Sequence, residues 1–211
     1  MIYLKDMGLK NGLDSTKYKK ALDFSYNFYR KKSRKGQRFP YFTFLSSVSN
    51  LIIENNGTTD EAIAGLFHDI LEDETGIRKQ SLIKNKFGVK VLNIVKQCSN
   101  SPNQLNNKDD WLINKKEFLE SMQKKSQSSL LVSICDKFHS SSCIIADYNK
   151  MGKKIWKDYN ISPEDLNWYY KSLCKNFKKC LKNHKNLKDR FQRNVNELEY
   201  FCKKKIESQK S

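Results

Sequence analysis

The stretch of sequence that most constrains the fold is Leu66-Phe67-His68-Asp69-Ile70-Leu71-Glu72-Asp73. It places a His-Asp pair in an apolar helix and a Glu-Asp pair about one turn later. A buried helix rarely carries so many ionisable groups, because burying a charge without a partner is costly. A bound metal ion or a network of paired charges removes that cost. The stretch therefore indicates a metal-dependent hydrolytic site.

The composition of the rest of the chain favours an all-α protein. The 211 residues include only 8 glycines and 3 prolines, so few residues interrupt helices. Hydrophobic residues make up 38% of the chain, which is enough for a core in one domain or one domain with an appendage. We therefore expect helices rather than a sheet.

The chain is strongly basic, with 40 Lys and Arg residues against 23 Asp and Glu residues and a formal net charge of +17. Such a charge suits a nucleic acid, an anionic membrane surface or a phosphorylated substrate. Only six of the basic residues are arginine, which recognises phosphates and bases better than lysine does. A solvated lysine-rich surface is therefore the preferred interpretation, ahead of nucleic-acid binding.

The cysteines and the apolar segments indicate the cellular compartment of the protein. The six cysteines form no C-x-x-C pair, which argues against a structural zinc site. The N-terminal residues lack the apolar core of a signal peptide, and no stretch approaches the roughly 20 apolar residues of a membrane span. These features predict a soluble cytoplasmic protein with reduced thiols and no membrane partner.

Hydrophobic periodicity and capping residues divide the chain into predicted helices. Thr58 and Glu61 form a capping box at the start of the helix that runs into the His-Asp pair. Ser162, followed by Pro-Glu-Asp, marks a second start, and Asp109 or Asp110 can cap a third helix. The other predicted helices cover about 15–32, 41–54, 80–87, 89–98 and 128–151, the last ending before Gly152.

Beyond residue 182 the pattern changes to a charged helix with one narrow apolar stripe. The stripe consists of Leu187, Phe191, Val195, Leu198 and Phe201 or Cys202. It is typical of a packing or dimerisation helix rather than a catalytic element. We therefore expect a main domain over residues 1–182 and a basic amphipathic C-terminal helix over 183–211, through which the protein could form a homo-oligomer.

A second acidic position completes the candidate metal site. Asp136 lies in the middle of another apolar helical segment. Together with His68 and Asp69 it offers one imidazole and two carboxylates, a mixture that suits Mn²⁺ or Mg²⁺. A bound metal ion lowers the pKa of its water and supplies hydroxide at neutral pH.

Four groups of residues stand in a fixed order along the chain. They are Arg34-Lys35-Gly36 with Pro40-Tyr41, Ala64-Gly65-Leu66-Phe67-His68-Asp69 with Glu72-Asp73, Phe87-Gly88-Val89-Lys90-Val91, and Cys135-Asp136-Lys137-Phe138-His139. In these motifs and their order, over roughly residues 17–177, the chain resembles the HD-domain phosphohydrolases, and most closely the RelA/SpoT-type (p)ppGpp hydrolase branch with its small stand-alone relatives. Ordered motifs at compatible spacing are far more specific than a single His-Asp pair.

The resemblance implies a compact HD-domain helical bundle, here with a C-terminal helical extension. It also implies removal of pyrophosphate or phosphate from a phosphorylated nucleotide, with Mn²⁺ as the expected cofactor. By the same resemblance, the metal ligands are His68, Asp69 and Asp136, the catalytic acids are Glu72 and Asp73, and the substrate-binding residues are Arg34, Lys35 and Lys137.

The chain departs from the family pattern at one expected metal ligand. Phe44 stands where the family has its first ligating histidine, and a phenyl ring cannot coordinate a metal ion. Ser140 stands where an asparagine usually follows the second acidic motif. The resemblance therefore leaves two hypotheses open, which are a metal-dependent nucleotide phosphohydrolase and a catalytically impaired nucleotide-binding or regulatory protein.

Other interpretations of the same residues remain alongside these. His68 and Asp69 could form a buried structural ion pair, and Glu72 and Asp73 could be solvated acids at a helix end. A basic nucleic-acid-binding protein is a third function, against which the low arginine content and the lack of a binding motif count. Steeply salt-dependent binding would distinguish it.

Overall fold

The computed structural model describes residues 12–33, 40–72, 76–99, 108–158 and 161–207. These residues form helices, with one isolated bridge between Ser33 and Pro40 and no strand, so the predicted all-α class is confirmed. The chain divides into two compact units, residues 1–99 and 100–211. A separate C-terminal domain beginning at residue 183 stays a prediction.

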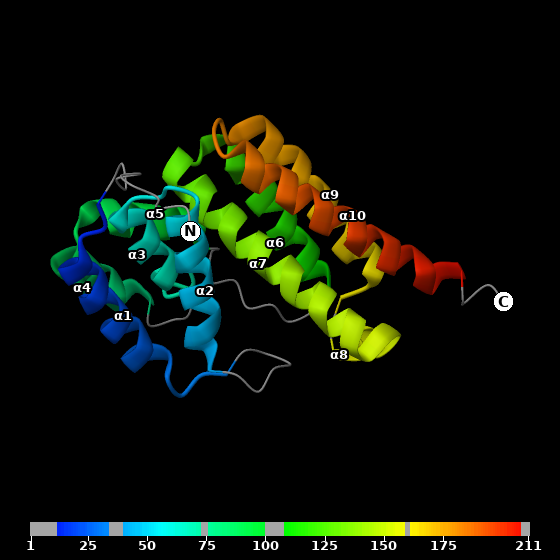
Figure 1. The fold of residues 1–211 in the computed structure, drawn as a ribbon, viewed down its shortest axis with the longest axis horizontal. Coiled ribbons are helices and arrows are strands. Elements are labelled where there is room, and N and C mark those ends of the chain that lie inside the picture. Colours follow the sequence, from blue (N-terminus) through cyan, green and yellow to red (C-terminus); the bar gives the residue numbers. More distant parts are fainter. Residues whose placement is uncertain (1–11, 34–39, 73–75, 100–107, 159–160, 208–211) are drawn as a thin grey trace, which may run out of the picture. The chain divides into compact units, whose positions relative to one another are not determined.

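The first unit is built around α3, which lies among its other helices (Figure 1). Ala62, Ile63, Ala64, Leu66 and Phe67 of α3 are fully buried. The helix packs against α1, α2 and α5, while α4 packs against α5. The bounds are α1 Ser15–Tyr29, α2 Tyr41–Glu54, α3 Thr59–Phe67, α4 Gly76–Phe87 and α5 Val89–Cys98.

Capping residues fix the start of α3 as the sequence predicts. The Thr58 side chain accepts a hydrogen bond from the backbone of Glu61, and the Glu61 carboxylate accepts one from the backbone of Thr58. This reciprocal arrangement satisfies amide groups that have no partner within the helix. The predicted capping box is therefore confirmed.

Gly65 allows α2 and α3 to approach closely. A Cβ atom at this position would lie 2.5 Å from Ile52 Cδ1 and 3.3 Å from the backbone of Ser49. The Ser49 hydroxyl donates a hydrogen bond of 2.8 Å to the carbonyl of Ala62, and it also lies 2.7 Å from the hydroxyl of Tyr18. A buried polar contact therefore accompanies the close packing that leads up to the His-Asp pair.

The His-Asp pair lies just after α3 and not within it. The helix ends at Phe67, and His68 is its C-cap. Beyond it the backbone continues in tighter turns, with bonds from the amide of Ile70 to the carbonyl of Phe67 and from that of Glu72 to that of Asp69. The prediction that the helix contains this pair is therefore wrong, because the regular helix ends at Phe67 and bonds between residues three apart follow it.

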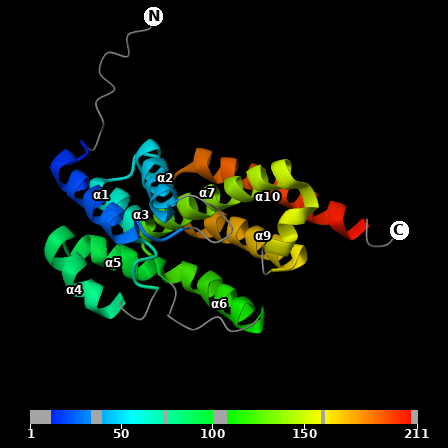
Figure 2. The same ribbon diagram turned by 90° about the horizontal axis from the view of Figure 1, so that it is seen from below.

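The second unit is a helical assembly in which α10 packs against α7 and α9 (Figure 2). The apolar stripe predicted for the C-terminal helix is buried there, with Leu187, Phe191 and Leu198 fully buried. Self-association through this helix stays a prediction. The bounds are α6 Lys108–Ser121, η1 Met122–Lys124, α7 Gln127–Met151, η2 Gly152–Lys154, α8 Ile155–Asp158, α9 Pro163–Cys180 and α10 Lys185–Glu207.

Local signals place most helix boundaries of the second unit correctly. The Ser162 side chain caps α9, and Gly152 ends α7 with a φ angle of 61°. One start is wrong, because α6 begins at Lys108 and Asp109 and Asp110 therefore lie in its first turn rather than at its N-cap. Acidic residues also stabilise a first turn through the helix dipole, so the two positions cannot be told apart by residue type.

No disulfide joins any of the six cysteines, all of which the structure describes, and four of them are buried. None of the helices in the described ranges is both long enough and apolar enough to cross a membrane.

The Asp60→Asn variant is expected to lose about 1 kcal/mol of stability at neutral pH. Asp60 lies in the first turn of α3, with Lys17 Nζ at 2.6 Å and Lys90 Nζ at 3.4 Å. Burial would raise the pKa of Asp60, but Lys17 and Lys90 outweigh it and hold this pKa below its ordinary value of 3.8.

The ionised carboxylate therefore stabilises the fold above about pH 4, and this contribution is lost as the pH falls through the lowered pKa. Urea titrations of the parent and the variant from pH 7 to pH 2.5 measure it. A constant difference between the two proteins across this range would contradict the assignment.

Candidate functional site

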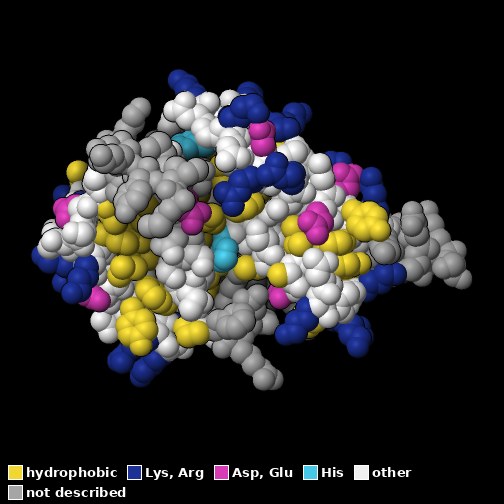
Figure 3. Space-filling model, in the orientation of Figure 1, with side chains coloured by type: hydrophobic (Ala, Val, Ile, Leu, Met, Phe, Trp, Pro, Cys, Tyr) yellow, Lys and Arg dark blue, Asp and Glu magenta, His cyan; other side chains and the backbone are white. Residues whose placement is uncertain are grey.

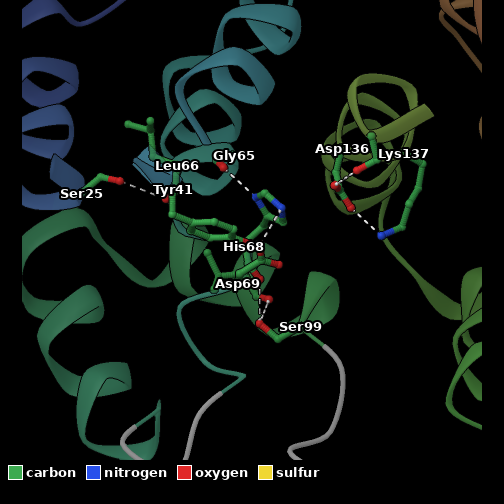
Figure 4. Close-up of polar contacts among 11 residues, drawn as sticks. Ser25, Tyr41, Gly65, Leu66, His68, Asp69, Ser99, Asp136 and Lys137 are labelled. Carbon is green, nitrogen blue, oxygen red and sulfur yellow. Dashed lines mark hydrogen bonds and ion pairs between the residues drawn. The ribbon is translucent and has the colours of Figure 1, made fainter. Parts of the chain in front are cut away.

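His68 is held in one orientation by the backbone of α3. Its side chain is 4% exposed, and its Nδ1 lies 2.7 Å from the carbonyl oxygen of Gly65 (Figure 4). A carbonyl oxygen only accepts, so Nδ1 carries the proton. The same contact leaves Nε2 as the atom that can bind a metal ion when the imidazole is neutral.

Asp69 lies next to that nitrogen, with its Oδ2 3.3 Å from His68 Nε2. A carboxylate and the lone pair of an imidazole repel each other unless a positive charge lies between them. A proton on Nε2 or a bound cation supplies this charge. The donor chemistry of the pair thus fits a divalent metal ion, with two of the three predicted protein ligands.

Two further hydrogen bonds fix this pair in place. The Tyr41 hydroxyl donates to Asp69 Oδ2, and the Ser99 hydroxyl donates to the backbone carbonyl of His68 at 3.0 Å (Figure 4). Tyr41 comes from the start of α2 and Ser99 from the end of α5. The orientation of the pair therefore depends on three separate helices of the first unit.

Phe44 lies beside His68, at the place where the resemblance expects a ligating histidine. The centroids of the Phe44 and His68 rings are 6.1 Å apart, and Phe44 is buried. Tyr41 lies one turn earlier on α2, with its ring centroid 5.9 Å from that of Phe44. The position that would complete the set of metal ligands is thus occupied by an aromatic ring.

A pocket with a volume of about 240 Å³ opens next to the His68–Asp69 pair. Its lining residues are Tyr29, Lys32, Ser33, Tyr41, Asp69 and Glu72. The pocket brings the carboxylates of Asp69 and Glu72 together with the ammonium group of Lys32, from the end of the segment that follows α1. Such a combination of acids and a cation suits a phosphorylated ligand with a bound metal ion.

Four residues of this pocket were not predicted as site residues, namely Tyr29, Lys32, Ser33 and Tyr41. Tyr41 belongs to the Pro-Tyr motif quoted above, which is the signal that could have identified it. Lys32 is one of a run of basic residues and has no distinguishing neighbour in the sequence. Only its position in the pocket singles it out.

Asp136 lies in the middle of α7, in the second unit, and is 8% exposed. Lys137 Nζ lies 2.6 Å from its Oδ2, and the Ser140 hydroxyl donates to its Oδ1 at 3.3 Å. Burial would lower the pKa of Lys137, but the Asp136 carboxylate, helped by Tyr169, holds it well above its ordinary value. Lys137, predicted to bind substrate, thus neutralises the carboxylate predicted to bind the metal (Figure 4).

Three predicted site residues, Arg34, Lys35 and Asp73, lie outside the described residues. Within the ranges that are described, no group of three or more His, Cys, Asp or Glu side chains is arranged to hold a metal ion. His68 and Asp69 form a pair, and Phe44 occupies the place beside them.

Comparisons with known proteins identify a family and similar folds. A family model described as HD domain matches residues 21–157. A metazoan ortholog of SpoT that hydrolyses ppGpp has a similar fold, with a TM-score of 0.68 and 19% identity over 88% of this chain and 97% of its own. Lmo0812 from Listeria monocytogenes EGD-e is also similar, with a TM-score of 0.62 and 17% identity over 76% of this chain and 99% of its own. No curated protein sequence matches the chain.

Proposed function

This chain belongs to the HD domain family. We propose that it removes phosphate or pyrophosphate from a phosphorylated nucleotide. An alarmone of the (p)ppGpp type is one candidate substrate. HD domains depend on divalent metal ions, and the family match supports a metal-dependent phosphohydrolase in general. The observation that carries the proposal is the contact of 3.3 Å between His68 Nε2 and Asp69 Oδ2, because it calls for a positive charge between the two groups.

His68 and Asp69 are the residues of the first unit that would hold Mn²⁺, and the resemblance adds Asp136 as a ligand. When bound, the metal ion supplies a water molecule of lowered pKa and polarises a phosphoryl oxygen. Tyr41 donates its hydrogen bond to Asp69 and keeps that carboxylate turned toward His68. Ser99 fixes the backbone of the same turn.

Glu72 and Lys32 are the groups of the pocket that would meet the substrate. Glu72 is exposed and lines the pocket beside Asp69, where its carboxylate can take a proton from water. Lys32 offers a cation for phosphate oxygens. The resemblance adds Asp73 as a catalytic acid and Arg34, Lys35 and Lys137 as substrate-binding residues.

A hydrolysis screen of the purified protein tests the proposal. The panel contains guanosine 3′,5′-bis-pyrophosphate, other nucleoside polyphosphates and simple nucleotides, each with Mn²⁺ and with EDTA, and chromatography separates the products. Turnover that requires Mn²⁺ supports the proposal. A folded protein that binds these nucleotides and leaves all of them intact would contradict it.

The packing of Phe44 against His68 favours a second candidate function. A phenyl ring in place of a ligand leaves the metal ion with fewer protein donors, which lowers its affinity. With a weakly held metal ion, the pocket would still bind a phosphorylated nucleotide through Lys32 without hydrolysing it. The chain would then act as a nucleotide-binding or regulatory protein.

The Phe44→His variant is expected to bind Mn²⁺ at least about tenfold more tightly than the parent, because it adds a further protein ligand beside His68. Isothermal titration of Mn²⁺ into metal-free protein measures the change. Phe42→His, which alters another aromatic residue of α2 that packs against Tyr26, is the matched control. Equal affinity in the parent and in Phe44→His would show that position 44 does not face the metal ion.

A further inference from the structure

The second unit contains a basic pocket that the proposed function does not use. It lies between α9 and α10 and has a volume of about 290 Å³. This size is just below the range of about 300–1,000 Å³ for small-molecule sites, so the occupant is small. The side chains that matter below are Lys171, Cys174, Lys175, Lys178, Gln192 and Glu199.

Three lysines form one wall of the pocket. Lys171, Lys175 and Lys178 follow one another at intervals of four and three residues, so they lie along the same face of α9. Like charges at this spacing repel one another and destabilise a helix. Lys and Arg side chains are also prominent along the upper edge of the molecule in Figure 3, where α9 and α10 are joined in Figure 1.

The lysines at the two ends of this row have polar partners in the pocket, whereas the middle lysine has no carboxylate partner among the described residues. Lys171 Nζ lies 3.2 Å from Glu199 Oε1, which also binds Lys203 at 2.8 Å. Lys178 Nζ donates to Gln192 Oε1 at 2.7 Å. Lys175 is exposed and has no carboxylate partner within the described ranges. Three cations against one carboxylate leave the pocket with a net positive charge.

The opposite wall is fixed in position by hydrogen bonds. The buried Cys174 thiol donates to Gln192 Oε1 at 3.0 Å, and Gln192 Nε2 donates to Asn196 Oδ1 at 2.7 Å. Burial raises the pKa of the Cys174 thiol and keeps it in the protonated form that donates. The pocket therefore has an ordered polar wall facing a row of cations.

We propose that this pocket binds the diphosphate group of a small phosphorylated molecule. The rise along α9 from Lys171 to Lys178 is roughly 10 Å, which is longer than one phosphate group and suits two linked phosphates. Lysine binds phosphate as a point charge from a flexible stem, so the row can adapt to such a group. The ligand is either inorganic pyrophosphate or the diphosphate of a nucleotide. The proposal does not depend on hydrolysis in the first unit.

Isothermal titration of inorganic pyrophosphate into the full-length protein, in metal-free buffer of low ionic strength, tests the proposal. The double variant Lys175→Gln/Lys178→Gln is expected to bind at least about tenfold more weakly, because two charge-assisted contacts are lost. The control Lys116→Gln/Lys157→Gln removes two exposed lysines of the same unit outside the pocket and is expected to change the affinity less than about twofold. Glu199→Gln is expected to tighten binding, because it removes the pocket's carboxylate.

Parallel titrations with GDP identify the source of the diphosphate. Equal affinities for pyrophosphate and GDP support recognition of the diphosphate alone, and tighter GDP binding that the double variant weakens supports a nucleoside diphosphate. The absence of binding by the parent, or equal weakening by the control variant, overturns the proposal. Binding that Lys32→Gln abolishes and the double variant retains also overturns it, because the anion then occupies the first unit.

Discussion

The Asp69→Asn variant is expected to lose at least about 100-fold of the Mn²⁺-dependent hydrolysis rate. The amide keeps the size of the side chain and can still accept the hydrogen bond from Tyr41, so the local fold is preserved. It removes the negative charge beside His68 Nε2, and a neutral pair holds a divalent ion far more weakly. Initial rates over a series of Mn²⁺ concentrations separate weaker metal binding from slower chemistry.

Asp23→Asn is the matched control for this experiment. Asp23 is an exposed residue of α1 in the same unit and undergoes the same change of charge, so its rate is expected to stay close to that of the parent. Asp69 would have no part in the metal site if its variant turned over substrate at the parent rate at limiting Mn²⁺. Loss of activity in both variants would point to a general effect of charge.

The Gly65→Leu variant is expected to lose more than about 3 kcal/mol of stability, because the added side chain has no room between α2 and α3. Ile52 Cδ1 is the flexible end of a side chain and can move, but the Ser49 Cα atom at 3.3 Å belongs to the backbone of α2. The corresponding fall in melting temperature is roughly 10 °C for a protein of this size. Differential scanning calorimetry measures it.

Two control variants, one with a smaller side chain and one at a distant position, are compared with Gly65→Leu. Gly65→Ala adds only the Cβ atom and is expected to cost less, whereas Gly12→Leu introduces the same side chain where nothing lies within 4 Å of a Cβ atom. Equal melting temperatures for Gly65→Leu and Gly12→Leu would mean that the two helices separate easily. The carbonyl of Gly65 also positions His68, so loss of packing here disturbs the metal pair as well.

Most of the fold could be predicted because its signals are local. The bounds of α2 and α5 agree with the sequence pattern, and the cap of α3 depends on residues only three positions apart. The end of α3 could not be predicted in this way. His68 caps the helix by turning its ring back to Gly65, and the tighter turns that follow have no apolar periodicity of their own.

The candidate site was predicted less completely than the fold, because its contacts join distant parts of the chain. The sequence motifs identified His68, Asp69 and Glu72, which are neighbours along the chain. The hydrogen bond from Tyr41 to Asp69 spans 28 residues, and Lys32 reaches the pocket from the segment after α1. Such contacts depend on how the helices pack, which a single sequence does not specify residue by residue.

The division of the chain at residue 99 has a spectroscopic consequence. All three tryptophans, Trp111, Trp156 and Trp168, belong to the second unit, whereas the first unit contains tyrosine but no tryptophan. Fluorescence that is excited selectively in the tryptophan side chains therefore reports on the second unit alone. If the units unfolded separately, tryptophan fluorescence and far-ultraviolet circular dichroism would show different unfolding transitions, because only the second signal reports on the whole chain. A single superimposable transition would mean that the two units unfold as one cooperative body.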